Sequence, residues 1–175
     1  MNVNETVIFN SQIYAATETG IFNADISNPL LIDFNNWQQN FSGRNFKKIK
    51  LFNNQLITVE NNSIFSINGT ALTLIRDFTE NVVSIKTSNS HLSIAFPTSG
   101  LILNTAYNQI FQSIANSEYN FTLNNVLFDN NRIFLATKEF GILSTTQNQS
   151  VLYTEIHPEG PLSNSSFSIT SRNNN

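Results

Sequence analysis

The sequence of 175 residues contains no cysteine, which excludes disulfide bonds and thiolate metal sites. Charged residues are scarce, at 12% of the chain, and the formal net charge is −3. So few charges, combined with a hydrophobic content of 40%, argue against an intrinsically disordered chain. The basic surface typical of a nucleic-acid-binding protein is also missing.

Long hydrophobic runs are absent as well. No apolar segment approaches the roughly 18 residues of a membrane span, and residues 1–10 lack the charged-then-apolar layout of a signal peptide. Sustained helical periodicity is not seen, and the best helical candidate, Gln109–Ala115, is better explained as a strand. What remains is a series of short apolar runs separated by asparagine-rich turns, which predicts an all-β protein.

One pattern occurs four times along the chain: an apolar strand, a tight polar turn and a second apolar strand. The residue that opens the second strand recurs at intervals of roughly 40 residues, which is typical of propeller blades of four strands each. Three of these residues are glycines, which we expect to supply a positive φ. The four turn residues are Gly20, Ser63, Gly100 and Gly141, and the small residues that align in the preceding strand are Ala16, Thr58, Ala95 and Ala136.

The pattern predicts a segment of a β-propeller with four consecutive four-stranded antiparallel blades plus the first strand of a fifth, as an arc of a seven-bladed propeller. The first strand of each blade is expected to lie innermost, and Leu30–Phe34 to form the fourth strand of the first blade. We expect one partial domain over residues 1–175, interrupted in its fifth blade, with apolar end faces that promote association. The expected blades cover residues 5–37, 46–78, 82–115 and 123–157, and the further strand covers residues 166–171.

The one local concentration of charge lies at the start of the second blade. The first strand of a blade lines the central channel of a propeller, so these cations are candidates to bind an anionic ligand such as a phosphorylated glycan. The same alternation of charged and apolar residues is also that of an ordinary half-solvated strand, which is the commoner case. The candidate ligand-binding residues are Arg44, Lys47, Lys48 and Lys50.

No arrangement of residues predicts catalysis, a metal site or a cofactor. The two histidines, His91 and His157, lie far apart in the repeat, and solvated or locally hydrogen-bonded roles are usual for such residues. The carboxylates fall in different blades, where their common role is solubility or loop hydrogen bonding. Trp37 is expected to be a packed anchor between blades, with stacking on a sugar as the alternative. We therefore predict that the protein is not an enzyme.

Several phrases resemble a known family. The match is most specific in the segments Ser27–Asp33 and His157–Asn164, and it runs in the same order and with similar spacing from about Asn4 to the end of the chain. These segments are similar to the first propeller domain of the PorZ family, surface-exposed components of the type IX secretion system of Bacteroidota. The phrases are IYAATETGIFNADISNPLLIDFNNWQ, IFLATKEFGILSTT and EIHPEGPLSNSSFSI.

The resemblance implies a non-enzymatic component of a cell-surface attachment complex, associated with the outer membrane. Its implied partners are other proteins of that complex, including the sortase, and anionic lipopolysaccharide that the complex delivers to the sortase. The repeats themselves resemble the wider group of two-component-regulator propellers. A sensor ectodomain that binds a glycan is therefore the alternative function, and a hydrolase is a third class that cleavage of a glycan would reveal.

Overall fold

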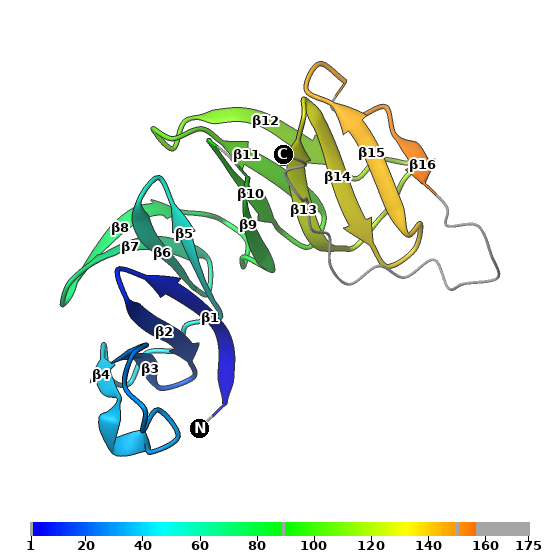
Figure 1. The fold of residues 1–175 in the computed structure, drawn as a ribbon. Coiled ribbons are helices and arrows are strands. Elements are labelled where there is room, and N and C mark those ends of the chain that lie inside the picture. Colours follow the sequence, from blue (N-terminus) through cyan, green and yellow to red (C-terminus); the bar gives the residue numbers. More distant parts are fainter. Residues whose placement is uncertain (1, 89, 150, 157–175) are drawn as a thin grey trace. The chain divides into compact units, whose positions relative to one another are not determined.

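The structure is a computed structural model that describes residues 2–88, 90–149 and 151–156. It contains four separate sheets, each with four antiparallel strands in sequential order (Figure 1). This confirms the predicted all-β class and the four four-stranded blades. The predicted strand at residues 166–171 and His157 lie outside the described residues. The chain divides into two compact units, one up to Thr79 and one from Glu80 onward, and each is described by itself.

The first unit holds two blades. Its core lies between them, where Ala16 and Ile21 of the first blade meet Ile49 and Leu56 of the second. The first strands of the two blades, β1 and β5, lie against each other. The first blade consists of β1 (Val3–Phe9), β2 (Gln12–Thr17), β3 (Gly20–Asp25) and β4 (Gln38–Asn40), and the second of β5 (Lys48–Phe52), β6 (Gln55–Glu60), β7 (Ser63–Asn68) and β8 (Ala71–Asp77).

The second unit repeats this arrangement. Its core is formed by Ala95, Ile102, Val126 and Leu135, among other residues, and strand β13 packs against β9 and β10. Gln109–Ile114 is a strand, as predicted. The third blade consists of β9 (Ser84–Ser88), β10 (His91–Ala95), β11 (Ser99–Leu103) and β12 (Gln109–Ile114), and the fourth of β13 (Leu123–Asp129), β14 (Arg132–Thr137), β15 (Ile142–Thr146) and β16 (Thr154–Ile156).

The small residues that align in the second strand of each blade are all completely buried. Thr58 is the one polar member, and its hydroxyl donates a hydrogen bond of 2.7 Å to the carbonyl of Lys48, so no buried polar group is left unsatisfied there. The sequence alignment of the four copies therefore corresponds to equivalent structural positions. The four residues are Ala16, Thr58, Ala95 and Ala136, each with an exposed fraction of 0%.

The turn glycines are of two kinds. Gly20 and Gly141 have positive φ, 144° and 71°, as predicted. In both turns a threonine hydroxyl donates a hydrogen bond to the glycine carbonyl. The distance is 2.8 Å from Thr17 to Gly20 and 3.0 Å from Thr137 to Gly141. The prediction is wrong for Gly100, whose φ is not positive. This glycine lies in β11, and a Cβ placed there would come within 2.8 Å of Cγ2 of Val126. Close packing between blades, and not backbone conformation, requires a glycine at this position.

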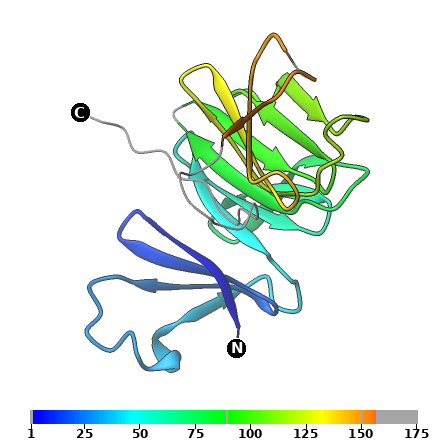
Figure 2. The same ribbon diagram turned by 90° about the vertical axis from the view of Figure 1, so that its right-hand side faces the viewer.

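The predicted fourth strand of the first blade, Leu30–Phe34, is also wrong. Those residues belong to a long connection that contains one turn of 3-10 helix, η1 (Phe34–Asn36), and the fourth strand is β4. The apolar run is misleading because polar side chains before and after it bond to its backbone: the amide of Leu30 donates to Oδ1 of Asn28, and Nδ2 of Asn36 donates to the carbonyl of Leu30. Figure 2 shows this connection with its single helical turn.

Candidate functional site

The four predicted ligand-binding cations lie around the start of β5. Lys48 and Lys50 flank Ile49, which is completely buried in the core of the first unit. Lys47 is exposed, whereas Arg44, Lys48 and Lys50 are half-buried. The structure thus brings the four residues into one region, but it gives them different surroundings.

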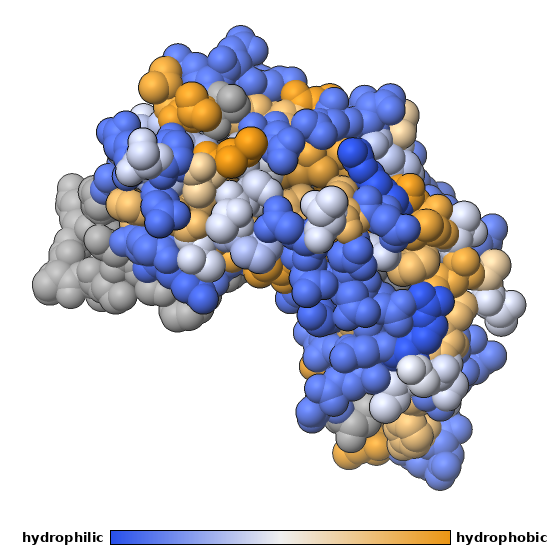
Figure 3. All heavy atoms as spheres, turned by 180° about the vertical axis from the view of Figure 1, so that it is seen from behind, coloured by the Kyte–Doolittle hydropathy of each residue, from blue (hydrophilic) through white to orange (hydrophobic). Residues whose placement is uncertain are grey.

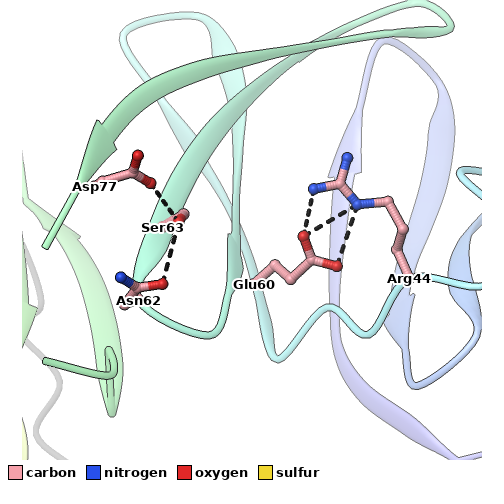
Figure 4. A network of polar contacts seen from close by, with 5 residues as sticks. All are labelled: Arg44, Glu60, Asn62, Ser63 and Asp77. Carbon is pink, nitrogen blue, oxygen red and sulfur yellow. Dashed lines mark hydrogen bonds and ion pairs between the residues drawn. The ribbon is translucent and has the colours of Figure 1, made fainter. Parts of the chain in front are cut away.

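Arg44 is held by a carboxylate of its own unit. Its Nε lies 3.1 Å from both carboxylate oxygens of Glu60, and its terminal nitrogen makes a further close contact with Oε2 (Figure 4). The guanidinium also lies over the rings of Phe65 and Phe46, 4.9 and 5.4 Å from their centroids. The hydrogen bonds to Glu60 raise the pKa of Arg44. A two-pronged contact of this kind fixes the side chain in place.

Lys50 is bound by a carboxylate of the neighbouring blade. Its Nζ lies 2.6 Å from Oε1 of Glu5, which stands on β1. The second oxygen of the same carboxylate accepts a hydrogen bond of 2.9 Å from the amide of Ile49. Glu5 therefore links the first two blades, and Lys50 is part of that link. Two of the four predicted cations thus have anionic partners inside the chain, which leaves Lys47 and Lys48 as the stronger candidates for an external anion.

A pocket of about 390 Å³ lies in the second unit, at the ends of strands of the third and fourth blades. This volume falls in the range of small-molecule sites. Three connections supply its walls: the turn between β9 and β10, the turn between β13 and β14, and the segment after β15. The residues that line it are Ser88, Ser90, His91, Phe128, Asp129, Asn130, Asn131 and Gln147.

The turn between β13 and β14 is tightly determined. Asn130 and Asn131 have φ values of 46° and 64°, and Asp129 pairs with Arg132 across the hairpin. Two successive residues with positive φ are what a two-residue hairpin turn requires, and asparagine tolerates this conformation well. The two amide side chains are therefore presented from a fixed backbone.

The backbone of Phe128, one of the residues that line the pocket, is fixed by two hydrogen bonds. Its carbonyl accepts a hydrogen bond from the hydroxyl of Ser88, and its amide donates one of 3.1 Å to Oγ of Ser93. The ring of Phe128 lies against the imidazole of His91, with centroids 4.4 Å apart and a tilt of 57°. Burial lowers the pKa of His91, which favours the neutral imidazole at neutral pH.

The chemistry of the pocket is that of hydrogen bonding without strong charge. Its lining residues offer hydroxyl, amide and imidazole groups, an aromatic ring and a single carboxylate, that of Asp129; none of them is a lysine or arginine. Such a set suits an uncharged ligand that carries several hydroxyl groups. Sequence reasoning missed this site because it considered His91 alone. The sequence signal that could have located this site was the turn Asn130-Asn131. The pocket residues of the third blade, such as His91, come close to this turn only in the folded chain.

Within residues 2–88, 90–149 and 151–156, no group of three or more histidine, aspartate or glutamate residues is arranged to hold a metal ion. The same part of the chain has no helix with the length and hydrophobicity of a membrane span.

Comparison with solved structures identifies the fold class. The extracellular domain of a protein described as a hybrid two-component system of B. thetaiotaomicron is similar with a TM-score of 0.67 and 15% identity, over 86% of this chain and 22% of that one. Hsv2p of Kluyveromyces lactis matches with a TM-score of 0.61 and 10% identity, over 85% and 51%. The N-terminal domain of Nup159 matches with a TM-score of 0.64 and 12% identity, over 89% and 48%.

These similarities, together with the four four-stranded blades, show that the chain has a β-propeller fold. Identities this low establish the fold alone. The chain spans between about a fifth and a half of the length of these proteins. The sequence matches no protein-family model and no curated protein.

Proposed function

We propose that this chain is a segment of an extracellular, non-enzymatic β-propeller that senses a ligand, comparable to the extracellular domain of the Bacteroides two-component system. The observation that carries the proposal is the pocket between the β9–β10 and β13–β14 turns. Turns at the ends of a rigid set of blades are well suited to present binding groups, because the scaffold fixes them while their side chains vary freely.

The proposed ligand is an uncharged glycan. The amide groups of Asn130, Asn131 and Gln147 can donate and accept hydrogen bonds to sugar hydroxyls, and the carboxylate of Asp129 can accept them. An anionic sugar would find no lysine or arginine among the lining residues. A single carboxylate also supports binding over hydrolysis, since glycoside hydrolysis ordinarily uses two carboxyl groups on either side of the bond.

A second candidate rests on the resemblance of several sequence phrases to the PorZ family. In that case the chain belongs to a cell-surface, outer-membrane-associated attachment complex, with the sortase and anionic lipopolysaccharide as partners. The supporting observation in the structure is Lys47 and Lys48, which have no acidic partner recorded among the described residues. Binding of an anionic glycan would then involve the first unit and would weaken with added salt.

Calorimetric titration of the protein with neutral oligosaccharides and with anionic lipopolysaccharide tests both candidates. Asn131→Gly retains a residue that adopts positive φ and removes the amide, so neutral-glycan affinity should fall about 2- to 10-fold, the effect of one lost hydrogen bond. Asn54→Gly is the matched control, because Asn54 occupies the equivalent turn between β5 and β6 with a φ of 57°. This control should leave the affinity unchanged.

The second candidate predicts different outcomes in the same titrations. Lipopolysaccharide would bind in a salt-sensitive way, and replacing Lys47 and Lys48 together by glutamine would weaken that binding while Asn131→Gly would not. Failure to bind any neutral oligosaccharide contradicts the sensing proposal. Failure to bind the anionic lipopolysaccharide contradicts the second candidate.

A further inference from the structure

The connection between β3 and β4 differs from its counterparts in the other blades. It runs from residue 26 to residue 37, whereas the connection between β7 and β8 consists of Gly69 and Thr70 alone, and that between β11 and β12 covers residues 104–108. Long connections in a compact repeat usually have a function of their own. Residues 26–37 are called the first-blade loop below.

The first half of the first-blade loop is fixed by two successive polar turns. Oδ1 of Asp25 accepts hydrogen bonds from the amide and the hydroxyl of Ser27, at 2.8 and 2.7 Å. Oδ1 of Asn28 then accepts one of 2.9 Å from the amide of Leu30. The amide of Ile26 donates to the carbonyl of Ser11, which attaches the start of the loop to the β1–β2 turn.

The second half is fixed by the helical turn η1 and by Trp37. Oδ1 of Asp33 accepts a hydrogen bond of 2.9 Å from the amide of Asn35. The indole N–H of Trp37 donates one of 2.9 Å to the carbonyl of Leu31, so the half-buried Trp37 is tied to this loop. The ring of Phe34 lies 5.2 Å from that of Phe22, which is buried on the first sheet.

This ordered loop presents apolar side chains to solvent. Ile32 is 98% exposed, Leu30 58% and Phe34 54%. On the face drawn in Figure 3, hydrophobic residues reach the surface in several places among hydrophilic ones, and single exposed apolar residues need no explanation. Three of them within five residues, held by a network of local hydrogen bonds, form a preorganised set, which lowers the entropic cost of binding.

We propose that the first-blade loop is a docking element for a partner protein, and that Ile32 inserts into an apolar pocket whose rim is basic. The charge follows from the loop and the residue that precedes it: Asp33 and Asp25 are both exposed, and residues 25–37 contain no lysine or arginine. Complementary positive charge on the partner would steer association.

Three observations argue against other occupants. An anionic membrane surface would repel the two aspartates, and such surfaces attract basic segments instead. Pairing with an extended peptide requires a row of free backbone groups, but the amides of Ile26, Leu30 and Asp33 already have partners. Contact of this loop with the same loop of a second copy would bring the exposed aspartates of both copies together, and repulsion between like charges disfavours that arrangement.

The test is site-specific photo-crosslinking in the organism that encodes the protein, with the full-length protein carrying a photoreactive amino acid at position 32. We expect a covalent adduct with one other protein, and no such adduct when the photoreactive residue is placed at Leu74, an apolar residue of β8 that is 49% exposed. The partner is identified from the adduct and purified on its own, without crosslinking. Its affinity for the protein without the photoreactive residue is then measured directly.

Two substitutions separate the apolar anchor from the charge. Ile32→Ser should weaken binding of the purified partner by at least about tenfold, since the variant no longer buries an aliphatic side chain in the apolar pocket of the partner. Asp33→Asn keeps an oxygen that accepts from the amide of Asn35 but removes the charge, so it should slow association at low salt and have little effect at high salt. Leu74→Ser should leave the affinity unchanged.

Several outcomes overturn the proposal. The first is the absence of any adduct from position 32. The second is an adduct with lipid, with a second copy of the chain or with another part of the same chain. The third is a purified partner that binds the Ile32→Ser variant as tightly as the native protein. The same proteins provide the control for folding, because thermal unfolding of Ile32→Ser should match that of the native chain.

Discussion

Replacing Gly100 by alanine should destabilise the second unit although the backbone accommodates alanine without strain. The added Cβ would lie 2.8 Å from Cγ2 of Val126 and 3.4 Å from Cδ2 of Leu135. Both of these residues belong to the buried core between the third and fourth blades. Contacts below 3.0 Å require one partner to move, and overpacking of this kind costs about 1 to 3 kcal/mol.

An opposing effect comes from the unfolded chain. Because the φ of Gly100 is not in the left-handed region, alanine reduces the entropy of the unfolded state and stabilises the protein by about 0.4 to 1 kcal/mol. The packing term is larger, so we expect a net loss of about 0.5 to 2 kcal/mol. Urea unfolding followed by circular dichroism measures this loss as a lower midpoint.

Val126→Ala provides the internal check. Alone it should cost about 2 kcal/mol, because it removes two buried methyl groups and leaves a cavity. Combined with Gly100→Ala, it frees the space that the new methyl group needs, so the double variant should be more stable than the sum of the two single effects by about 0.5 to 2 kcal/mol. A Gly100→Ala variant as stable as the native chain, or strictly additive effects, would refute the packing argument.

Three further predictions concern ionisable groups. Glu60→Gln removes the charge that binds Arg44 at a partly exposed site, so urea unfolding should show a loss of about 0.5 to 1 kcal/mol that shrinks at high salt. The hydrogen bonds from Ser27 lower the pKa of Asp25, so carbon-detected NMR titration should show a lower pKa for Asp25 than for an ordinary surface aspartate, and Ser27→Ala should raise it. Burial lowers the pKa of His91, so the unfolded state binds a proton more strongly than the folded state does. The free energy of unfolding should therefore fall as the pH drops below about 6.5, the ordinary histidine pKa, and a His91→Gln variant should lack this decrease.

The strands and most turns could be predicted because they depend on local chemistry. Alternation of apolar and polar residues locates a half-buried strand wherever one face packs and the other is solvated. The Asn53-Asn54 turn was identified from composition, and both residues have positive φ in the structure, 48° and 57°. Asparagine tolerates this conformation through its own side chain, so no tertiary contact is needed to predict it.

The features that could not be predicted depend on residues far apart in the sequence. The requirement for glycine at position 100 comes from Val126, which belongs to the next blade. Lys50 was a candidate for an external anion, but its partner is Glu5, 45 residues away. Leu30–Phe34 looked like a strand because the hydrogen bonds that shape it come from polar side chains before and after it, and a pattern of hydrophobicity does not record them.

The four copies also differ in ways that bear on where binding sites lie in this chain. Positions that are equivalent in all four blades, such as Ala16 and Ala136, are buried and serve packing alone. The blades differ in their connections: the first has the loop that exposes Ile32, and the β13–β14 turn of the fourth contributes Asn131 to a pocket shared with the third. A change at the buried positions that the blades share would disturb the packing of neighbouring blades. Specific binding groups are therefore expected in the connections, where the blades differ. The loop and the pocket are two such places, in separate units of the chain, and variants of one should leave binding at the other unchanged.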